Sequence, residues 1–106
     1  MYDIETIQAV FASGAAEYTQ HFKARLIERN ISHADVKKAI FSGIIIEQAL
    51  DDEPLPSVVI FGYNARAKPL HVVASIDDDK IWLVTAYQPS TEIWNPDYKT
   101  RKVVGQ

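Results

Sequence analysis

The spacing of the apolar residues changes at residue 44, and this change constrains the fold more than any other feature of the chain. Before it, apolar side chains recur every three or four residues, as they do along one face of a helix. After it, they come in continuous β-branched runs, which are typical of buried strands. The pattern predicts helices over residues 4–13 and 20–29 and between Ser32 and Gly43. It predicts strands over residues 44–46, 58–61, 70–76 and 81–87.

The third predicted helix has the most specific end signals. Ser32 is followed three residues later by Asp35, which resembles a capping box with a short acidic partner. Ile31 and Val36 stand at the two positions of a hydrophobic staple, which fixes how the chain enters a helix. Gly43 comes where a left-handed residue often ends a helix, so we expect a left-handed backbone there.

Three helices followed by four strands with short connections predict an α+β fold. We expect two to three N-terminal helices packed on one face of a four-stranded antiparallel sheet. The chain has 106 residues, which is enough for one hydrophobic core and too few for two, so we expect a single domain over residues 1–106.

Composition excludes several classes of function. The chain has no cysteine, so it has neither disulfides nor thiolate chemistry, and we expect a cytoplasmic location. It has no apolar run long enough to span a membrane, so we expect no membrane association. The net charge of −3 argues against strong electrostatic binding of nucleic acid, although bases gather in residues 23–38 and 99–106.

Motifs for cofactors and metals are also absent from the sequence. The glycines are isolated, so there is no glycine-rich loop of the kind that cradles a phosphate, and no G-x-S-x-G motif presents a nucleophilic serine. The three histidines lack the spacing of a helical metal pair, and a zinc site would have to assemble from remote elements. We therefore predict no cofactor and no metal.

His21, Arg25 and Arg29 are four residues apart, which places them along one ridge of the second predicted helix. Arginine matches the oxygens of a phosphate, and histidine can move a proton near neutral pH. The ridge could therefore hold a phosphodiester. The alternative is a solvated ridge on which Glu28 and other acids pair with the arginines.

His71 and Tyr87 are the polar candidates on the predicted strands. If the alternate apolar residues of its strand face the helices, His71 faces away from them. Tyr87 ends the last strand and could donate a proton or orient a phosphate; the alternative for each residue is packing or a structural hydrogen bond. Trp94, Tyr98 and Arg101 lie in the tail, where the two aromatic side chains could stack on RNA bases, or Trp94 could cover one end of the core.

Taken together, the sequence resembles a bacterial family of small proteins of unknown function. That family is grouped with the RelE/BrnT-like toxins of the barnase–colicin–RelE ribonuclease superfamily. The matching pattern runs through His21, Arg25, Glu28, Arg29, Ile31, Ser32, Asp35, Val36, Gly43, Ile45–Glu47, Asp51, Asp52, Pro54, Pro56, Ser57, Gly62, Pro69–Val73, Thr85–Tyr87, Pro89, Trp94, Arg101 and Lys102. The resemblance implies helices packed on an antiparallel sheet, a toxin-like ribonuclease and a cognate antitoxin as partner. The family's recurrent polar positions match His21, Arg25, Arg29, His71, Tyr87 and Arg101.

Our first hypothesis is a metal-independent endoribonuclease that acts on messenger RNA, either free or on the ribosome. The RNA's own 2′-hydroxyl would attack the adjacent phosphate, with His21 as general base or acid and Tyr87 or His71 as the complementary proton donor. Arg25, Arg29 and Arg101 would neutralise the charge that grows on the phosphate. The rival hypotheses are a non-catalytic protein-interaction module and a domain whose ridge is merely solvated. A basic concave patch joining residues 21–29 to 99–102 would favour the enzyme, and an acidic rim would favour the module.

Overall fold

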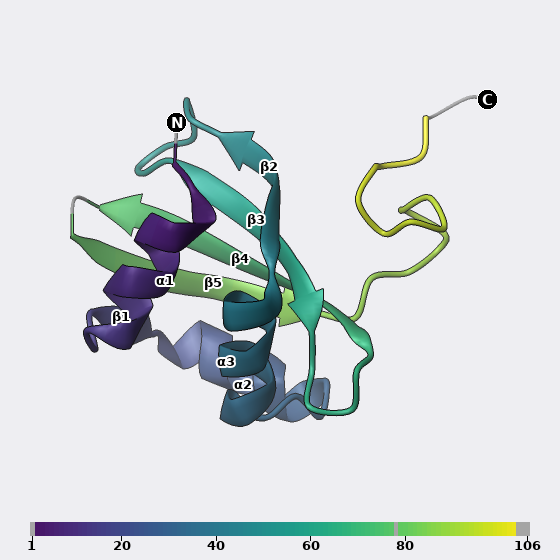
Figure 1. Ribbon diagram of the computed structural model, residues 1–106, viewed down its shortest axis with the longest axis horizontal. Coiled ribbons are helices and arrows are strands. Elements are labelled where there is room, and N and C mark those ends of the chain that lie inside the picture. Colours follow the sequence, from purple (N-terminus) through teal and green to yellow (C-terminus); the bar gives the residue numbers. More distant parts are fainter. Residues whose placement is uncertain (1, 78, 104–106) are drawn as a thin grey trace.

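The computed structural model describes residues 2–77 and 79–103, and it has the α+β class that the sequence predicts. The described part of the chain has three helices and five strands. One short strand lies between the first two helices, and the other four strands follow the third helix (Figure 1). The helices are α1 (Ile4–Ala12), α2 (Gln20–Glu28) and α3 (His33–Ser42); the strands are β1 (Ala16–Tyr18), β2 (Ile44–Ala49), β3 (Ser57–Tyr63), β4 (Pro69–Asp77) and β5 (Lys80–Tyr87). None of the helices in the described part of the chain is long and apolar enough to cross a membrane.

Each helix begins at a side chain that accepts a hydrogen bond from its first turn. Asp3, Thr19 and Ser32 are the three N-caps. The predicted capping box is confirmed, because the Asp35 amide donates to Ser32 Oγ and the Ser32 amide donates to Asp35 Oδ2, both at 3.0 Å. These contacts span only three residues, which is why the helix starts can be predicted from sequence alone.

The sheet differs from the predicted four-stranded antiparallel meander. Its order is β1-β5-β4-β3-β2, and β2 to β5 are antiparallel neighbours as expected. The fifth strand, β1, pairs in parallel with residues 81–83 of β5, so the sheet is mixed. Three residues are too few to show a strand period, and the partner of β1 lies some 65 positions along the chain, so no local pattern predicts this strand.

Gly43 is not the left-handed helix cap that the sequence predicts. Its φ is −98°, and its backbone is extended. A Cβ atom at Gly43 would collide with the carbonyl oxygen of Ala39 and lie 2.7 Å from Cγ2 of Ile60. A Cβ at Gly62 would collide with the same carbonyl. Glycine is therefore required at both positions because α3 lies directly against β3, where there is no room for a side chain.

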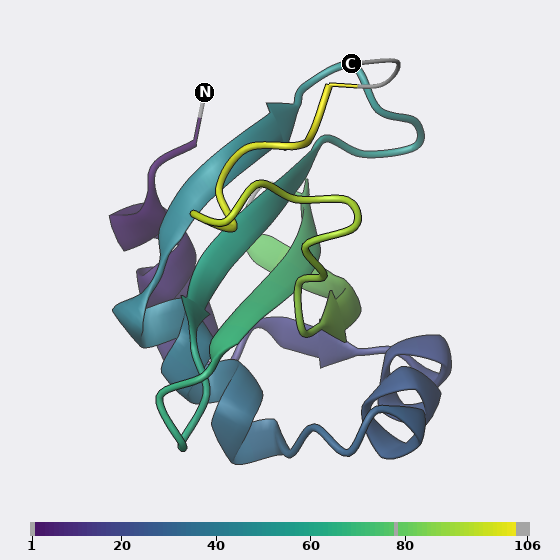
Figure 2. The ribbon, with the colours of Figure 1, turned by 90° about the vertical axis from the view of Figure 1, so that its right-hand side faces the viewer.

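The two faces of the sheet are covered in different ways. The helices bury one face in a core that includes Ile7, Phe22 and Val36. Residues 88–103, which we call the tail, cross part of the opposite face (Figure 2). Trp94 of the tail is only 1% exposed, so it is a covering residue rather than a surface for stacking RNA bases. Its place is over the second face of the sheet, not at the end of the helix-side core.

Candidate functional site

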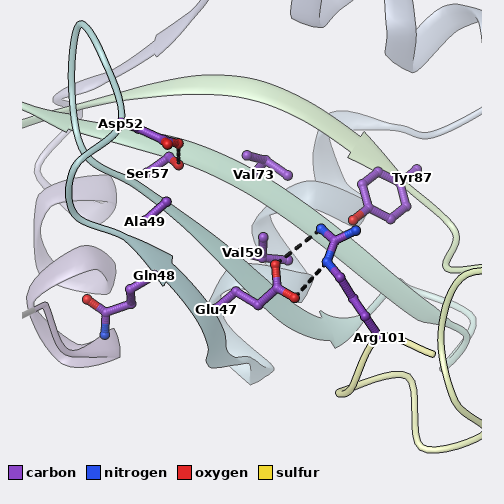
Figure 3. Close-up of a pocket in the computed structure, with 9 residues that line it drawn as sticks. All are labelled: Glu47, Gln48, Ala49, Asp52, Ser57, Val59, Val73, Tyr87 and Arg101. Carbon is purple, nitrogen blue, oxygen red and sulfur yellow. Dashed lines mark hydrogen bonds and ion pairs between the residues drawn. The ribbon is translucent and has the colours of Figure 1, made fainter. Parts of the chain in front are cut away.

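The face of the sheet that the tail crosses, which we call the tail face, carries Glu47, His71 and Tyr87. Strand register places Glu47 beside Val59, and Val59 beside Val73. The next row along the strands joins Phe61, His71 and Tyr87. Where the tail leaves this face open there is a hollow of about 470 Å³, the tail hollow (Figure 3). It is lined by Glu47, Gln48, Ala49, Asp52, Ser57, Val59, Val73, Tyr87 and Arg101.

His71 is fully buried beneath the tail, and both of its ring nitrogens have partners. Its Nε2 lies 2.7 Å from the backbone carbonyl oxygen of Tyr98, and its Nδ1 lies 3.3 Å from the hydroxyl of Tyr87. A carbonyl can only accept, so Nε2 carries the proton and donates it. Burial lowers the pKa of His71, against the smaller opposing effects of the Tyr98 carbonyl and Glu47, so the ring is neutral. Nδ1 is then an acceptor, and the Tyr87 hydroxyl donates to it.

Tyr87 therefore has its hydroxyl hydrogen directed by His71 and its oxygen at the wall of the tail hollow. Burial raises the pKa of this phenol, and the charges of Arg101 and Arg29 act against that increase. The phenol keeps its proton at neutral pH. Its hydrogen bond to His71 is longer than the usual O–H hydrogen bond, so the hydrogen can turn toward another acceptor at low cost.

Arg101 joins the tail to the other side of the hollow. Its Nε and Nη2 donate to the two carboxylate oxygens of Glu47 at 2.8 and 3.1 Å, and its guanidinium lies 4.6 Å from the centre of the Trp94 ring. The guanidinium points toward the oxygen of Tyr87 (Figure 3). Sequence reasoning did not select Glu47 as a site residue. The available signal was a charged residue directly after the apolar run 44–46, inside a strand.

The predicted ridge of α2 divides into separate parts. His21 is exposed in the first turn, and Arg25 pairs with Glu28 at 2.7 Å, as the solvated-ridge alternative anticipated. Arg29 instead reaches the end of β5, where its Nη1 donates to Thr85 Oγ1 at 2.9 Å and to the carbonyl oxygen of Ala86 at 2.8 Å. Eight helical residues place His21 about 12 Å from Arg29 along the helix axis. The structure thus brings His71, Tyr87 and Arg101 together, with Arg29 near them, and leaves His21 and Arg25 apart.

The tail hollow is more acidic than a phosphate site usually is. It holds the carboxylates of Glu47 and Asp52 and one guanidinium, that of Arg101. Asp52 accepts a 2.6 Å hydrogen bond from the hydroxyl of Ser57. Within residues 2–77 and 79–103, no group of three or more His, Asp or Glu side chains is placed to hold a metal ion.

Comparison with known proteins identifies one family. A family model described as a domain of unknown function, DUF4258, matches residues 18–88, which is about two thirds of the chain. The match includes Glu47, His71 and Tyr87, and it ends before Trp94 and Arg101. No curated protein and no solved structure gives a significant match. Nothing in these comparisons links the chain to the RelE/BrnT-like toxins that the sequence resembles.

Proposed function

Because the chain belongs to the DUF4258 family of domains of unknown function, its activity must be argued from its own site, and we propose a toxin-like, metal-independent endoribonuclease acting on messenger RNA. The observation that supports the proposal is the arrangement of Glu47, Tyr87 and Arg101 around one open hollow. These side chains are a carboxylate, a protonated phenol and a guanidinium. RNA, free or on the ribosome, and a cognate antitoxin protein are the partners that belong to this proposal.

The three groups supply what internal cleavage of RNA requires. The 2′-hydroxyl attacks the adjacent phosphorus while the bond from phosphorus to the 5′-oxygen breaks, which leaves a 2′,3′-cyclic phosphate and a 5′-hydroxyl. Glu47 would take the proton of the 2′-hydroxyl, and Tyr87 would give its proton to the departing 5′-oxygen. Arg101 would stabilise the charge that grows on the phosphate. For this, the phosphate has to replace Glu47 as the partner of Arg101.

In this scheme His71 is a positioning residue. It is fully buried and bonded through both nitrogens, so it cannot touch the substrate, but it directs the hydroxyl of Tyr87. This replaces the sequence-based hypothesis in which His71 donates a proton itself. His21, the general base or acid of that hypothesis, lies on the outer ridge and has no role in the scheme.

The test is induction of the protein in a bacterial host, with growth and messenger RNA integrity followed together. Glu47→Gln and Tyr87→Phe should each reduce cleavage by about a hundredfold or more. Tyr63→Phe is the matched control, because Tyr63 is also at a strand end but does not line the hollow. His21→Ala separates this scheme from the ridge hypothesis and should leave cleavage intact. Normal growth with intact RNA for well-expressed wild-type protein would overturn the proposal.

A non-catalytic protein-interaction module is the second candidate, and the charge of the tail hollow favours it. Arg101 is already compensated by Glu47, and Asp52 adds a further negative charge. Such a hollow suits a lysine or arginine of a partner protein better than a phosphate. A photo-crosslinker in place of Ser57 would capture that partner in cells. In this case Asp52→Asn should reduce crosslinking, and RNA should stay intact with the wild-type protein.

A further inference from the structure

A second, larger hollow lies on the other side of the end of β5. It has a volume of about 750 Å³ and is formed by the α2–α3 connection, the β3–β4 hairpin and the first residue after β5. We call it the helix–hairpin hollow. Its lining residues are Leu26, Ile27, Arg29, Asn30, Ile31, Ser32, Asp35, Asn64, Ala65, Arg66, Lys68 and Gln88.

Short-range hydrogen bonds hold the hairpin in place beside α3. The Asn64 side chain accepts from the amides of Arg66 and Lys68 at 2.8 and 3.0 Å, so the turn has a defined shape. Asp35 of α3 accepts from the amide of Ala65 at 3.0 Å, which ties the hairpin to the start of the helix. In Figure 1 the β3–β4 connection extends past the end of the sheet, on the side where α3 begins. Arg66 and Lys68 are thus carried on a fixed turn.

The charge of the helix–hairpin hollow is positive. It contains Arg29, Arg66 and Lys68 against a single acid, Asp35. Hydrogen bonds from Ser32 and Ala65, and more weakly the charge of Arg66, lower the pKa of Asp35, so this carboxyl is ionised at neutral pH. Even so, none of the three bases forms an ion pair with an acid in the described residues. Arg66 and Lys68 are therefore available to an anionic ligand, and Arg29 keeps its charge for one although its Nη1 is bonded to Thr85 and Ala86.

Consecutive residues at the end of β5 line the two hollows. Tyr87 lines the tail hollow, and the next residue, Gln88, lines the helix–hairpin hollow. Arg29 bridges them, since it lines the second hollow while bonding to the carbonyl of Ala86 and acting electrostatically on Tyr87. Ile27, which is 82% exposed, adds an apolar surface to the same hollow. A chain-like anion could pass from one hollow to the other across Arg29.

We propose that the helix–hairpin hollow binds the sugar–phosphate backbone of single-stranded RNA, with Arg29, Arg66 and Lys68 contacting its phosphates. Arginine forks and a lysine ammonium suit phosphate oxygens, and Ile27 offers apolar contact to a ribose or base. The RNA phosphodiester next to this segment then lies beside Tyr87 in the tail hollow. The choice of RNA as the ligand, and the placing of its next phosphodiester beside Tyr87, rest on the proposed function. Binding in the helix–hairpin hollow does not itself require cleavage.

The test uses the full chain carrying Tyr87→Phe, so that a labelled RNA of 12 nucleotides is bound without being cut. Fluorescence anisotropy at 50 and 200 mM salt gives Kd and its salt dependence. Charge reversal by Arg66→Glu with Lys68→Glu should weaken binding at least tenfold. It should also reduce the salt slope by about 1.4, since each single-strand phosphate contact contributes about 0.7. The matched control is Lys37→Glu with Lys38→Glu, two exposed bases of α3 outside the hollow, which should change Kd less than threefold.

The outcomes separate this inference from the proposed function. Equal losses in both double variants, or no binding by the parent protein, would overturn the inference even if RNA is cleaved in cells. Hollow-dependent binding without any cleavage by wild-type protein would uphold the inference and overturn the ribonuclease. Tighter binding of a polyglutamate peptide than of the RNA, lost in the same Arg66/Lys68 variant, would assign the hollow to an acidic protein segment instead.

Discussion

The two hollows use their basic residues in opposite ways. In the tail hollow, Arg101 is paired with Glu47 and packed over Trp94, so its charge helps to hold the tail on the sheet. In the helix–hairpin hollow, Arg66 and Lys68 form no ion pair within the described residues and line an open space. The net charge of −3 therefore does not show that the two sites differ: in the tail hollow the basic residue is paired with an acid, whereas the helix–hairpin hollow is cationic. An acidic chain can still present a local surface for an anion, because screening limits charge effects to about 8–10 Å at ordinary salt.

The largest expected effect comes from removing the tail's covering residue. Trp94→Ala should lower the free energy of unfolding by about 3–5 kcal/mol, because the side chain is almost fully buried against His71. Urea unfolding measures this. Ile93→Ala is the control, since Ile93 is 55% exposed and should change stability by less than about 0.5 kcal/mol. If the tail does not stabilise the sheet, the two variants will have the same free energy of unfolding. Arg101 would then have no structural role in the tail hollow, and the contrast with the helix–hairpin hollow would be wrong.

The next effect separates chemistry from binding. Tyr87→Phe should reduce RNA cleavage by about a hundredfold, because the phenol can no longer donate a proton. It should leave the affinity for RNA within about twofold, since the phosphate contacts of the helix–hairpin hollow remain. Measuring the cleavage rate and Kd on the same RNA checks both. A parallel fall in both quantities would mean that the two hollows are not functionally distinct.

Acid should destabilise the fold through His71. Its pKa is lowered in the folded state by burial, so the unfolded chain binds more protons once the pH falls through about 6.5. Stability should therefore be complete above this pH and decrease as the pH falls, by up to about 1.4 kcal/mol per pH unit. Urea unfolding between pH 7.5 and 5.0 measures the slope. His71→Asn should remove most of this slope and His33→Gln, at an exposed position, should retain it.

The smallest effect concerns the compensating ion pair. Glu47→Gln should lower the free energy of unfolding by no more than about 1 kcal/mol, because both partners are partly exposed and solvent screens the pair. The same change removes a carboxylate from the tail hollow, so RNA should bind a few times more tightly although it is cleaved more slowly. Anisotropy and cleavage assays on one preparation test this. Weaker binding would show that Glu47 contributes to ligand recognition rather than opposing it.

Much of the candidate site was accessible from sequence, but its arrangement was not. His71 and Tyr87 are selected by residue type and strand position, and Arg101 by the family resemblance; the structure brings the three together. Glu47 was missed because its partner, Arg101, lies 54 residues away. His21 and Arg25 share a helix ridge with Arg29, yet only Arg29 reaches β5. Arg29 is the residue directly after α2, and this end of the helix lies beside the end of β5. Helical spacing places residues on a ridge and does not say what that ridge faces.

The sequence by itself determined the features that depend on neighbours a few residues apart. Asp3, Thr19 and Ser32 begin the helices, and the apolar runs after residue 44 mark four of the strands. Tertiary structure alone decided the parallel strand β1, the close packing of α3 that requires Gly62, and the burial of His71 under the tail. The physical reason is range: capping and periodicity act within three or four residues, whereas these contacts join segments far apart in the chain. Only the packed fold brings such segments together.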